Sequence, residues 1–522
     1  MANESLIFTG GRMTRVSGNN KLLKIVLALL CLLFWLQSVH AQNTEETPGE
    51  KVPTQKSDDS PWDDASEIDP FESEMDEFAG GQDSEQEADT PWPEESAAAP
   101  WENSTAAEKL ELGGRVKNKF ALDTHDNNEF EDLFQNHLLL QLDTTYRPYA
   151  SIEAKISLQA DHYTYGRDTD WKNDSNFRLL DAYVNFAGQG VNLKVGNQIV
   201  RWGKADGYSP LDNVNPEDLR DGIGGRREDR KMQIPMANLE FYKGRFTIQA
   251  LYIPFFIKSR YDLKGTDWAL YDHYQHEIGA FAIHEQDLSD IVEESEAGLK
   301  MAGIAGKFDY AFSYLYTHED VASLDSLATP IGFEPQFSSH VIKDLARFAQ
   351  ATDQAIHMSY QRQSIYGFEF ETTVSAFGLR GDLAYTDSLS YTTEQLKRIQ
   401  KPVLQYWVGA DYNGPGAFYV NVQFGQIYIQ DFDETILLAE EISSIVNGTI
   451  SKEFSNGDVK LEFRYYYDFS GDGALYNPKC IANFWRNLKL EIGIEFFDGT
   501  DAHPLGFYRI NDQAYATVEW LF

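Results

Sequence analysis

Hydrophobic and polar residues alternate with a period of two along most of the chain from residue 110 onward. Successive side chains of a strand point to opposite faces, so this period predicts strands with one apolar and one polar face. The clearest run is 488–496, where Leu488, Leu490, Ile492 and Ile494 alternate with polar residues and glycine. Similar runs occupy 152–159, 418–424, 459–468 and 515–522.

The same pattern predicts 18 strands in an all-β chain. Many runs reach about 10 residues, which suits membrane-spanning strands of roughly 9–11 residues better than globular strands of about 5–6. The strands 134–146, 358–376 and 476–485 are the least regular, so 16 strands is the alternative. The expected strands are 110–122, 134–146, 150–164, 177–187, 191–203, 231–242, 245–256, 296–307, 309–318, 358–376, 379–388, 402–412, 417–429, 437–454, 459–468, 476–485, 488–498 and 512–522.

The connections between these strands alternate between short and long, which is typical of a transmembrane antiparallel β-barrel with tight turns at one rim. Short connections are expected at 147–148, 188–190, 243–244, 377–378, 413–416 and 455–458, and long ones near 204–230, 257–294, 319–355 and 389–401. An even number of strands returns both termini to the same side, which we expect to be the periplasm. A soluble β-sandwich, the other all-β possibility, also alternates but has shorter strands.

The amino terminus has the pattern of a signal peptide. Lys21 and Lys24 precede an apolar run over 25–36, and a small-residue cleavage site ends at Ala41. The run of 12 residues is shorter than the roughly 20 that a helix needs to span a bilayer. We therefore expect residues 1–41 to be removed on export. Met13 is an alternative start, because it would give a signal peptide of more ordinary length.

Residues 42–108 form a separate acidic segment with 21 acidic and 2 basic residues. This composition cannot bury enough apolar surface to offset the entropy of ordering, so we expect a disordered periplasmic segment before a barrel that occupies 109–522. Pro-Trp recurs within it, at Trp62, Trp92 and Trp101. These tryptophans are candidate docking residues for a periplasmic partner; the alternative is a spacer with incidental aromatics.

The net charge of the chain is −38, of which residues 109–522 carry −22. Such an acidic chain lacks the basic surface that nucleic-acid phosphates require, which excludes a nucleic-acid partner.

Beyond the expected signal peptide the only cysteine is Cys480, so no intrachain disulfide forms there.

Two short motifs carry a resemblance to a known family. Residues 196–206 read Gly-Asn-Gln-Ile-Val-Arg-Trp-Gly-Lys-Ala-Asp and are followed by Asn215-Pro216, and residues 504–508 read Pro-Leu-Gly-Phe-Tyr. The chain resembles the alginate-export-type group of Gram-negative outer-membrane porins, including relatives of unknown function. The resemblance implies a monomeric barrel of about 18 strands in the cell outer membrane that passes solutes. It does not imply alginate, because a polyanion exporter is expected to have a basic lumen.

The chain ends in Phe522, the last residue of an alternating strand. Its position resembles the carboxyl-terminal signal that the barrel-assembly machinery reads in outer-membrane barrels. We therefore expect that machinery to be a partner and Phe522 to act in assembly.

Residues 206–230 are the best candidate for a functional site. This predicted loop is dense in both charges, and Pro216 and the glycines at 222, 224 and 225 favour a compact structure. Folded into the lumen, it would form a constriction that selects solutes by charge and size. The alternative is a solvated external loop whose charges pair with one another. The candidates are Asp206, Asp212, Glu217, Asp218, Arg220, Asp221, Arg226, Arg227 and Arg230.

Metal-binding and catalytic patterns are weak. The histidines near 272–277 and 284–285 fit no established metal-ligand spacing, so surface histidines are the favoured interpretation and no metal or other cofactor is expected. No Gly-x-Ser-x-Gly elbow or distinctive Ser/His/Asp spacing is present, and no carboxylate pair stands out.

These observations favour a porin-like channel for small or weakly charged and cationic solutes over two alternatives. One is a non-enzymatic scaffold that docks a periplasmic or surface partner through residues 42–108. The other is a barrel enzyme, for which the chain offers no motif.

Overall fold

The computed structural model describes residues 110–522 apart from 125–132, 168–169, 221, 223, 225–226, 263–267, 269–282, 289–291, 326–355, 394–396, 486 and 501–504. The expected signal peptide, the acidic segment with its three tryptophans, and the histidines at 273 and 276 lie outside the described residues. No helix in the described part of the chain is both long and apolar enough to cross a membrane.

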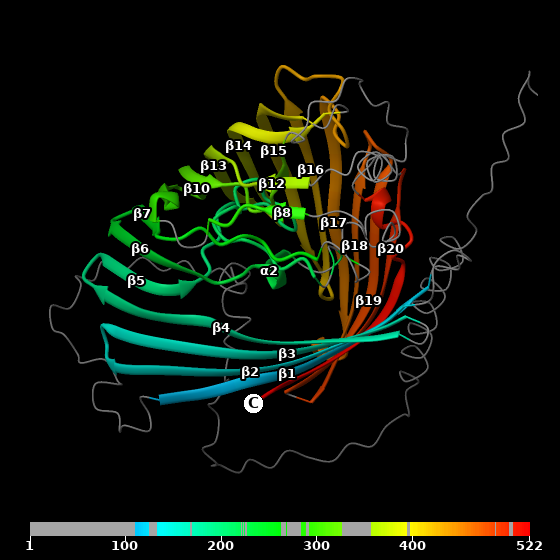
Figure 1. Cartoon of the computed structure of the whole chain (residues 1–522). Coiled ribbons are helices and arrows are strands. Elements are labelled where there is room, and N and C mark those ends of the chain that lie inside the picture. Colours follow the sequence, from blue (N-terminus) through cyan, green and yellow to red (C-terminus); the bar gives the residue numbers. More distant parts are fainter. Residues whose placement is uncertain are drawn as a thin grey trace, which may run out of the picture. The chain divides into compact units, whose positions relative to one another are not determined.

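Eighteen antiparallel strands form one closed sheet (Figure 1). Each strand pairs with the next one of the sheet along the chain, and β1 also pairs with β21, from Arg115↔Leu521 to Asp123↔Gln513, which closes the barrel. The prediction of 18 strands is confirmed, and the alternative of 16 is wrong. The strands are β1 (Leu110–Asp123), β2 (Leu133–Tyr149), β3 (Ile152–Arg167), β4 (Asp170–Gly188), β5 (Val191–Gln198), β6 (Ile234–Lys243), β7 (Phe246–Ile253), β9 (Glu296–Ala305), β10 (Phe308–His318), β13 (Arg362–Val374), β14 (Phe377–Thr392), β15 (Arg398–Gly414), β16 (Phe418–Ile429), β17 (Ile442–Phe454), β18 (Val459–Asp468), β19 (Gly473–Trp485), β20 (Leu488–Asp498) and β21 (Gln513–Leu521).

A second, small sheet lies in the long connections. Its strands are β8 (Ile283–Glu285), β11 (Ser323–Leu324) and β12 (Ile356–Ser359), with β12 between the other two. The helical elements are short, namely α2 (Arg227–Arg230), η3 (Val292–Glu294), η4 (Ser455–Gly457) and η5 (Gly506–Tyr508).

The two faces of each strand meet different surroundings. In β20, Ile492 is 55% exposed on the outer face, whereas Glu495 on the inner face is 3% exposed and accepts a hydrogen bond from Gln513. The predicted alternation of outward apolar and inward polar residues is thus confirmed. A barrel that closes on itself and has an apolar outer face can sit in lipid, the design of outer-membrane barrels. The predicted barrel class and outer-membrane location are confirmed.

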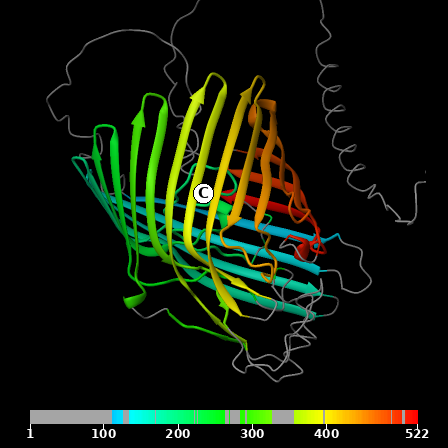
Figure 2. The ribbon, with the colours of Figure 1, turned by 90° about the horizontal axis from the view of Figure 1, so that it is seen from above.

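Tight turns gather at one rim and longer connections at the other (Figure 2). Two of the predicted turns are displaced. Arg147-Pro148 lies within β2, where the ladder to β3 shifts register between Tyr146 and Tyr149, and the turn follows at 150–151. Proline lacks the N–H that a ladder needs, so it fits this irregularity rather than a turn. The turn expected at 377–378 falls at 375–376, where Ser375 has φ 59°.

Replacing the outward Ile492 with arginine is expected to lower the free energy of unfolding in lipid by about 2–4 kcal/mol, because the charge would face hydrocarbon. Unfolding in urea with lipid vesicles measures this. The matched control is Lys489→Gln on the inner face of the same strand, which should change stability by less than about 1 kcal/mol. Equal tolerance at the two positions would contradict the assigned lipid-facing surface.

Deletion of Phe522 is expected to lower the amount of protein in the outer membrane. Its backbone forms two hydrogen bonds with Gly114, of 2.9 and 3.0 Å, at the seam between β1 and β21. Quantitative outer-membrane fractionation measures insertion, with Leu521→Val as a control that keeps the terminal phenylalanine. Normal insertion of the truncated chain would show that Phe522 is not an assembly signal.

Candidate functional site

Residues 199–233, here called the inner segment, connect β5 to β6 inside the barrel. Figure 1 shows α2, which belongs to this segment, within the ring of strands. The expected strand 191–203 therefore ends at Gln198. The side chain of Gln198 is buried and its Nε2 donates to the carbonyls of Lys194, Gly196 and Met236 at 3.2–3.4 Å, which fixes the end of β5.

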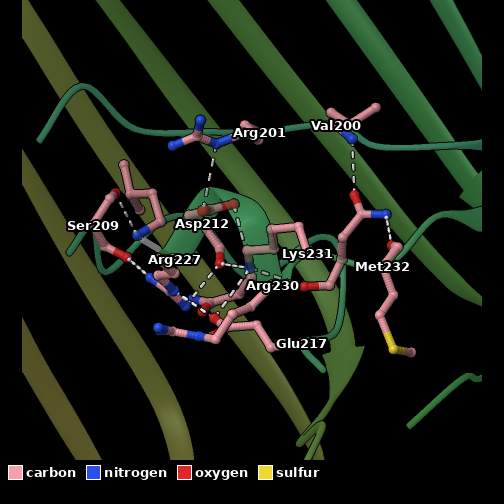
Figure 3. A network of polar contacts seen from close by, with 12 residues as sticks. Val200, Arg201, Ser209, Asp212, Glu217, Arg227, Arg230, Lys231 and Met232 are labelled. Atoms are coloured by element: carbon pink, nitrogen blue, oxygen red, sulfur yellow. Dashed lines mark hydrogen bonds and ion pairs between the residues drawn. The ribbon is translucent and has the colours of Figure 1, made fainter. Parts of the chain in front are cut away.

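Asn215 holds the two ends of the inner segment together. It is fully buried, and its Oδ1 accepts a hydrogen bond of 2.8 Å from the backbone N–H of Val200. Its Nδ2 donates to the carbonyls of Gln198, at 3.0 Å, and of Met232, at 2.8 Å (Figure 3). Asparagine suits this position because one amide can both accept and donate. The Gln and Asn-Pro positions of the family-like motif thus have structural roles.

An apolar cluster docks the inner segment onto one side of the wall. Trp202 packs there and donates from Nε1 to Gln249 at 2.8 Å, while a Cβ at Gly298 would lie 2.7 Å from the Trp202 ring. Burial of such apolar surface stabilises the docked position by about 25 cal/mol per Å². The segment contributes Val200, Trp202, Leu211 and Val214 to the cluster, and the wall contributes Ile234, Met236, Leu251, Ile253, Leu315, Ile365 and Ala384.

Two wall carboxylates clamp the backbone of the segment after Trp202. Glu369 of β13 accepts the N–H of Gly203 at 2.7 Å, and Asp382 of β14 accepts the N–H groups of Lys204 and Ala205 at 2.8 and 2.9 Å. Gly203 has φ 97°, and a Cβ there would lie 1.9 Å from Ser209 Oγ, so the position requires glycine. Charge-assisted bonds of this kind are about twice as strong as neutral ones.

Asp206 extends the contacts around the wall. Its carboxylate accepts hydrogen bonds from Arg380 of β14 and Asn421 of β16, both at 2.9 Å. Its carbonyl accepts a bond of 3.3 Å from Asn447 of β17. Three strands therefore hold this one residue.

A buried cluster of charges forms the middle of the segment (Figure 3). Glu217 accepts hydrogen bonds from Arg227 Nε at 2.5 Å and Arg230 Nε at 3.2 Å, and it lies 3.5 Å from Lys231 Nζ. Asp212 lies 3.5 Å from the same ammonium group and 3.7 Å from Arg201. Burial acts to raise the pKa of the Glu217 carboxyl, but the charges of Arg227, Lys231 and Arg230 outweigh it and lower that pKa to about 2.

The far side of the segment reaches the opposite wall. Asp218 accepts hydrogen bonds from Arg178 of β4, at 3.0 Å, and from Arg220, at 2.7 and 2.8 Å. The guanidinium of Arg220 lies 5.2 Å from the ring centroid of Tyr163 of β3. On the near side, Arg464 of β18, the neighbour of β17, donates to the carbonyl of Gly224 at 3.4 Å. The inner segment thus spans the lumen from β13–β18 on one side to β3 and β4 on the other.

Most predicted site residues therefore lie in the lumen, and their charges pair with one another. Asp212, Glu217, Arg227 and Arg230 form the buried cluster, Asp218 and Arg220 form the far contact, and Asp206 binds the wall; Asp221 and Arg226 lie outside the described residues. The structure combines features of the two predicted alternatives: the loop enters the lumen, and its charges pair with one another. Whether these residues line the pore stays a prediction.

Sequence reasoning missed the residues that place the segment. Gln198, Trp202 and Asn215 belong to the motif that carried the family resemblance, so their spacing was a usable signal. Glu369, Asp382 and Arg380 gave none, because they lie on ordinary alternating strands and meet the segment only through barrel closure.

The small sheet at the long-connection rim borders a pocket of about 400 Å³ that includes His284, Glu285, His357 and Arg398. The two imidazole rings are stacked, with centroids 5.1 Å apart. Among the described residues no group of three or more histidine, cysteine or acidic side chains has metal-binding geometry.

Comparison with known proteins gives one family match and several similar folds. The model of a family described as protein of unknown function (DUF1302) matches residues 143–453. No curated protein matches. Among solved structures, Pseudomonas aeruginosa OccK5 (OpdH) is 12% identical with a TM-score of 0.44, over 80% of this chain and 98% of that one. Acinetobacter baumannii OccAB1 is 7% identical with a TM-score of 0.43, over 81% and 99%. The outer-membrane channel DcaP of the same organism is 10% identical with a TM-score of 0.37, over 79% and 97%.

Proposed function

The chain belongs to the family described as protein of unknown function (DUF1302), and we propose a function from its own geometry. It is a non-enzymatic, porin-like channel of the outer membrane, in which the inner segment forms the constriction. The observation that carries this proposal is that residues 199–233 cross the lumen and are fixed to the wall on both sides. A specific relation to alginate-export-type porins stays a prediction.

The fixed position of the segment favours a permanent size filter over a mobile gate. One side is docked through buried apolar residues and the ion pair of Asp206 with Arg380, and the other side through the ion pair of Asp218 with Arg178. Small solutes would pass beside it, in water that contacts polar inner faces such as those of Glu491 and Lys479. Large polymers would be excluded by the same obstruction.

The charge arrangement favours weak cation preference. Arg227 and Arg230 are bound to Glu217, and Arg220 to Asp218, so these arginines are not unopposed charges at the constriction. The acidic excess of residues 109–522 then sets the field at the mouths, where salt screens it over roughly 8–10 Å.

Reversal potentials in planar bilayers under a KCl gradient test this selectivity. We expect modest K⁺ preference at low salt that fades as salt rises, because surface charge is screened. Neutralising Arg220 and Asp218 together, with Arg220→Gln and Asp218→Asn, is the control that preserves net charge and should leave the preference unchanged. Clear chloride preference in the native protein would show that the arginines, not the net charge, set the selectivity.

A further inference from the structure

Among the described residues, one edge of β4 has no partner strand over most of its length. β4 pairs with β3 from Asp170 to Phe186, but with β5 only over residues 182–188. Residues 170–181 therefore have no ladder on the β5 side within the described parts of the chain. A strand edge of this length presents a row of N–H and C=O groups without a sheet partner.

The chain that could have paired with residues 170–181 of β4 is the chain that forms the inner segment. β3 and β4 have 16 and 19 residues, whereas β5, β6 and β7 have 8, 10 and 8. The chain that would extend β5 beside residues 170–181 turns inward after Gln198 and returns only at Ile234. The inner segment is thus made of chain withdrawn from the wall, which leaves a gap in the ladder beside β4.

The lower part of this gap lies at the level of the apolar outer face. Phe177 is 71% exposed and Leu179 48% exposed on the outside of β4. The next outward pairs between β3 and β4, toward the start of β4, are polar. His162 hydrogen-bonds Ser175 at 2.8 Å, and Thr164 donates to Asn173 at 2.9 Å. Backbone groups without partners are tolerated at membrane depth only where they border protein or a wet cavity. The edge therefore borders the inner segment, which Asp218 joins to Arg178, and the water of the lumen.

Three guanidinium groups gather on the lumen side of the gap. Arg178 and Arg220 both bind Asp218, whose backbone forms an isolated bridge with Arg260. The Nη1 of Arg260 is buried and has no hydrogen-bond partner among the described residues. Asp161 and Asp218 bind Arg178, and Asp174, at 3.9 Å from Arg220, is more than half exposed. A buried N–H without a partner costs free energy that an acidic ligand group would recover.

We propose that the gap beside residues 170–181 of β4 is a lateral portal for amphiphiles with an acidic head group, which pass between the lumen and the membrane. The apolar chain would lie against Phe177 and Leu179, and the head group would meet Arg178 and Arg260. The portal proposal rests on the proposed function only because the portal opens into the channel lumen. It adds a second route through the protein and a second class of solute.

Hydrogen exchange in lipid nanodiscs tests the edge itself. Amides of residues 170–181 that point away from β3 are expected to exchange fast, whereas β3, paired on both sides, stays protected. Protection of this edge equal to that of β3 would show that it is covered, and would overturn the proposal.

Transfer of a fluorescent alkyl sulfonate into proteoliposomes tests the portal. In a Cys480→Ser background, Phe177→Cys is labelled with a bulky maleimide; Phe312→Cys on the outer face of β10, a position where phenylalanine is 57% exposed and β10 is paired on both sides, is the matched control. Leu179→Cys serves as a second portal variant if Phe177→Cys folds poorly. We expect a severalfold loss of transfer on labelling at the portal and none at position 312. No transfer by the unlabelled protein, or equal loss at both positions, would overturn the portal.

The head-group preference is tested with Arg260→Gln. Transfer of the alkyl sulfonate is expected to fall severalfold, and that of a fluorescent alkyl glucoside, which has a neutral head, to stay unchanged. Equal loss for both amphiphiles would refute recognition of an acidic group. KCl conductance is measured in parallel: its absence from the native protein would count against the channel, whereas the transfer assay alone decides the portal.

Discussion

Single-channel conductance is expected to rise severalfold when residues 204–230 are replaced by a short Gly-Ser linker. The replacement removes the part of the inner segment that reaches from Asp382 to Arg178 and Arg464, and leaves Val200 and Trp202 on the apolar dock. The linker can be short because Val200 and Met232, which both hydrogen-bond Asn215 in the native protein, lie close together; Asn215 itself is removed with the segment. Planar-bilayer recordings of the inserted protein measure the change.

The matched control is a replacement of the same kind at the rim. Residues 432–440 connect β16 to β17 outside the ladder, so a linker there should leave conductance unchanged. If the lumen replacement also had no effect, the inner segment would not narrow the path, and the proposed constriction would be wrong. The gain should be larger for bulky ions than for K⁺, because a wider path relaxes a size filter.

Replacing Glu217 with alanine is expected to destabilise the docked inner segment by about 3–5 kcal/mol, the usual cost of removing one partner from a buried ion pair. Arg227, Arg230 and Lys231 would then remain buried, with Asp212 as the nearest carboxylate to Lys231. Hydrogen exchange of residues 199–233 measures the destabilisation, and single-channel noise reports its effect on the pore. Asp174→Ala removes a carboxylate whose side chain is 54% exposed, and should cost less than about 1 kcal/mol.

The pH dependence of the docked segment follows from the same carboxylate. A carboxyl whose pKa is lowered on folding contributes stability at pH values above its unfolded pKa, near 4.3, and loses it as pH falls through the folded value. Because the pKa of Glu217 is lowered to about 2, its contribution should persist from pH 7 to about 4.5 and vanish only near pH 2. Hydrogen exchange of residues 199–233, corrected for the intrinsic pH dependence of exchange, measures this. A marked loss of protection between pH 7 and 5 in the native protein that is absent from the Glu217→Ala variant would contradict this assignment.

The strands could be predicted because one local property, alternation, decides them. Even the irregular runs 134–146, 358–376 and 476–485 correspond to β2, β13 and β19, since each is held by two neighbouring ladders. The exit of the chain after Gln198 could not be predicted from the pattern. It depends on side-chain bonds of Gln198 and on Asn215, which lies 17 residues further on.

The candidate site was predictable as a segment but not as a structure. Charge density singled out residues 206–230, and glycine and proline indicated a compact form. Which charges pair depends on their positions inside the closed barrel. Asp206 meets Arg380, which lies 174 residues later, and Asp218 meets Arg178, which lies 40 residues earlier on β4. No local pattern carries such partners.

The path of the inner segment also constrains the order in which the chain assembles. Asp206 contacts Asn421 and Asn447, which are 215 and 241 residues later, so the segment cannot reach its final position before the strands that carry those residues are present. The seam joins residues as distant as Arg115 and Glu519. Contacts of such sequence separation form late, because the loops that they close are long. The inner segment is therefore expected to dock, and the seam between β1 and β21 to close, late in assembly.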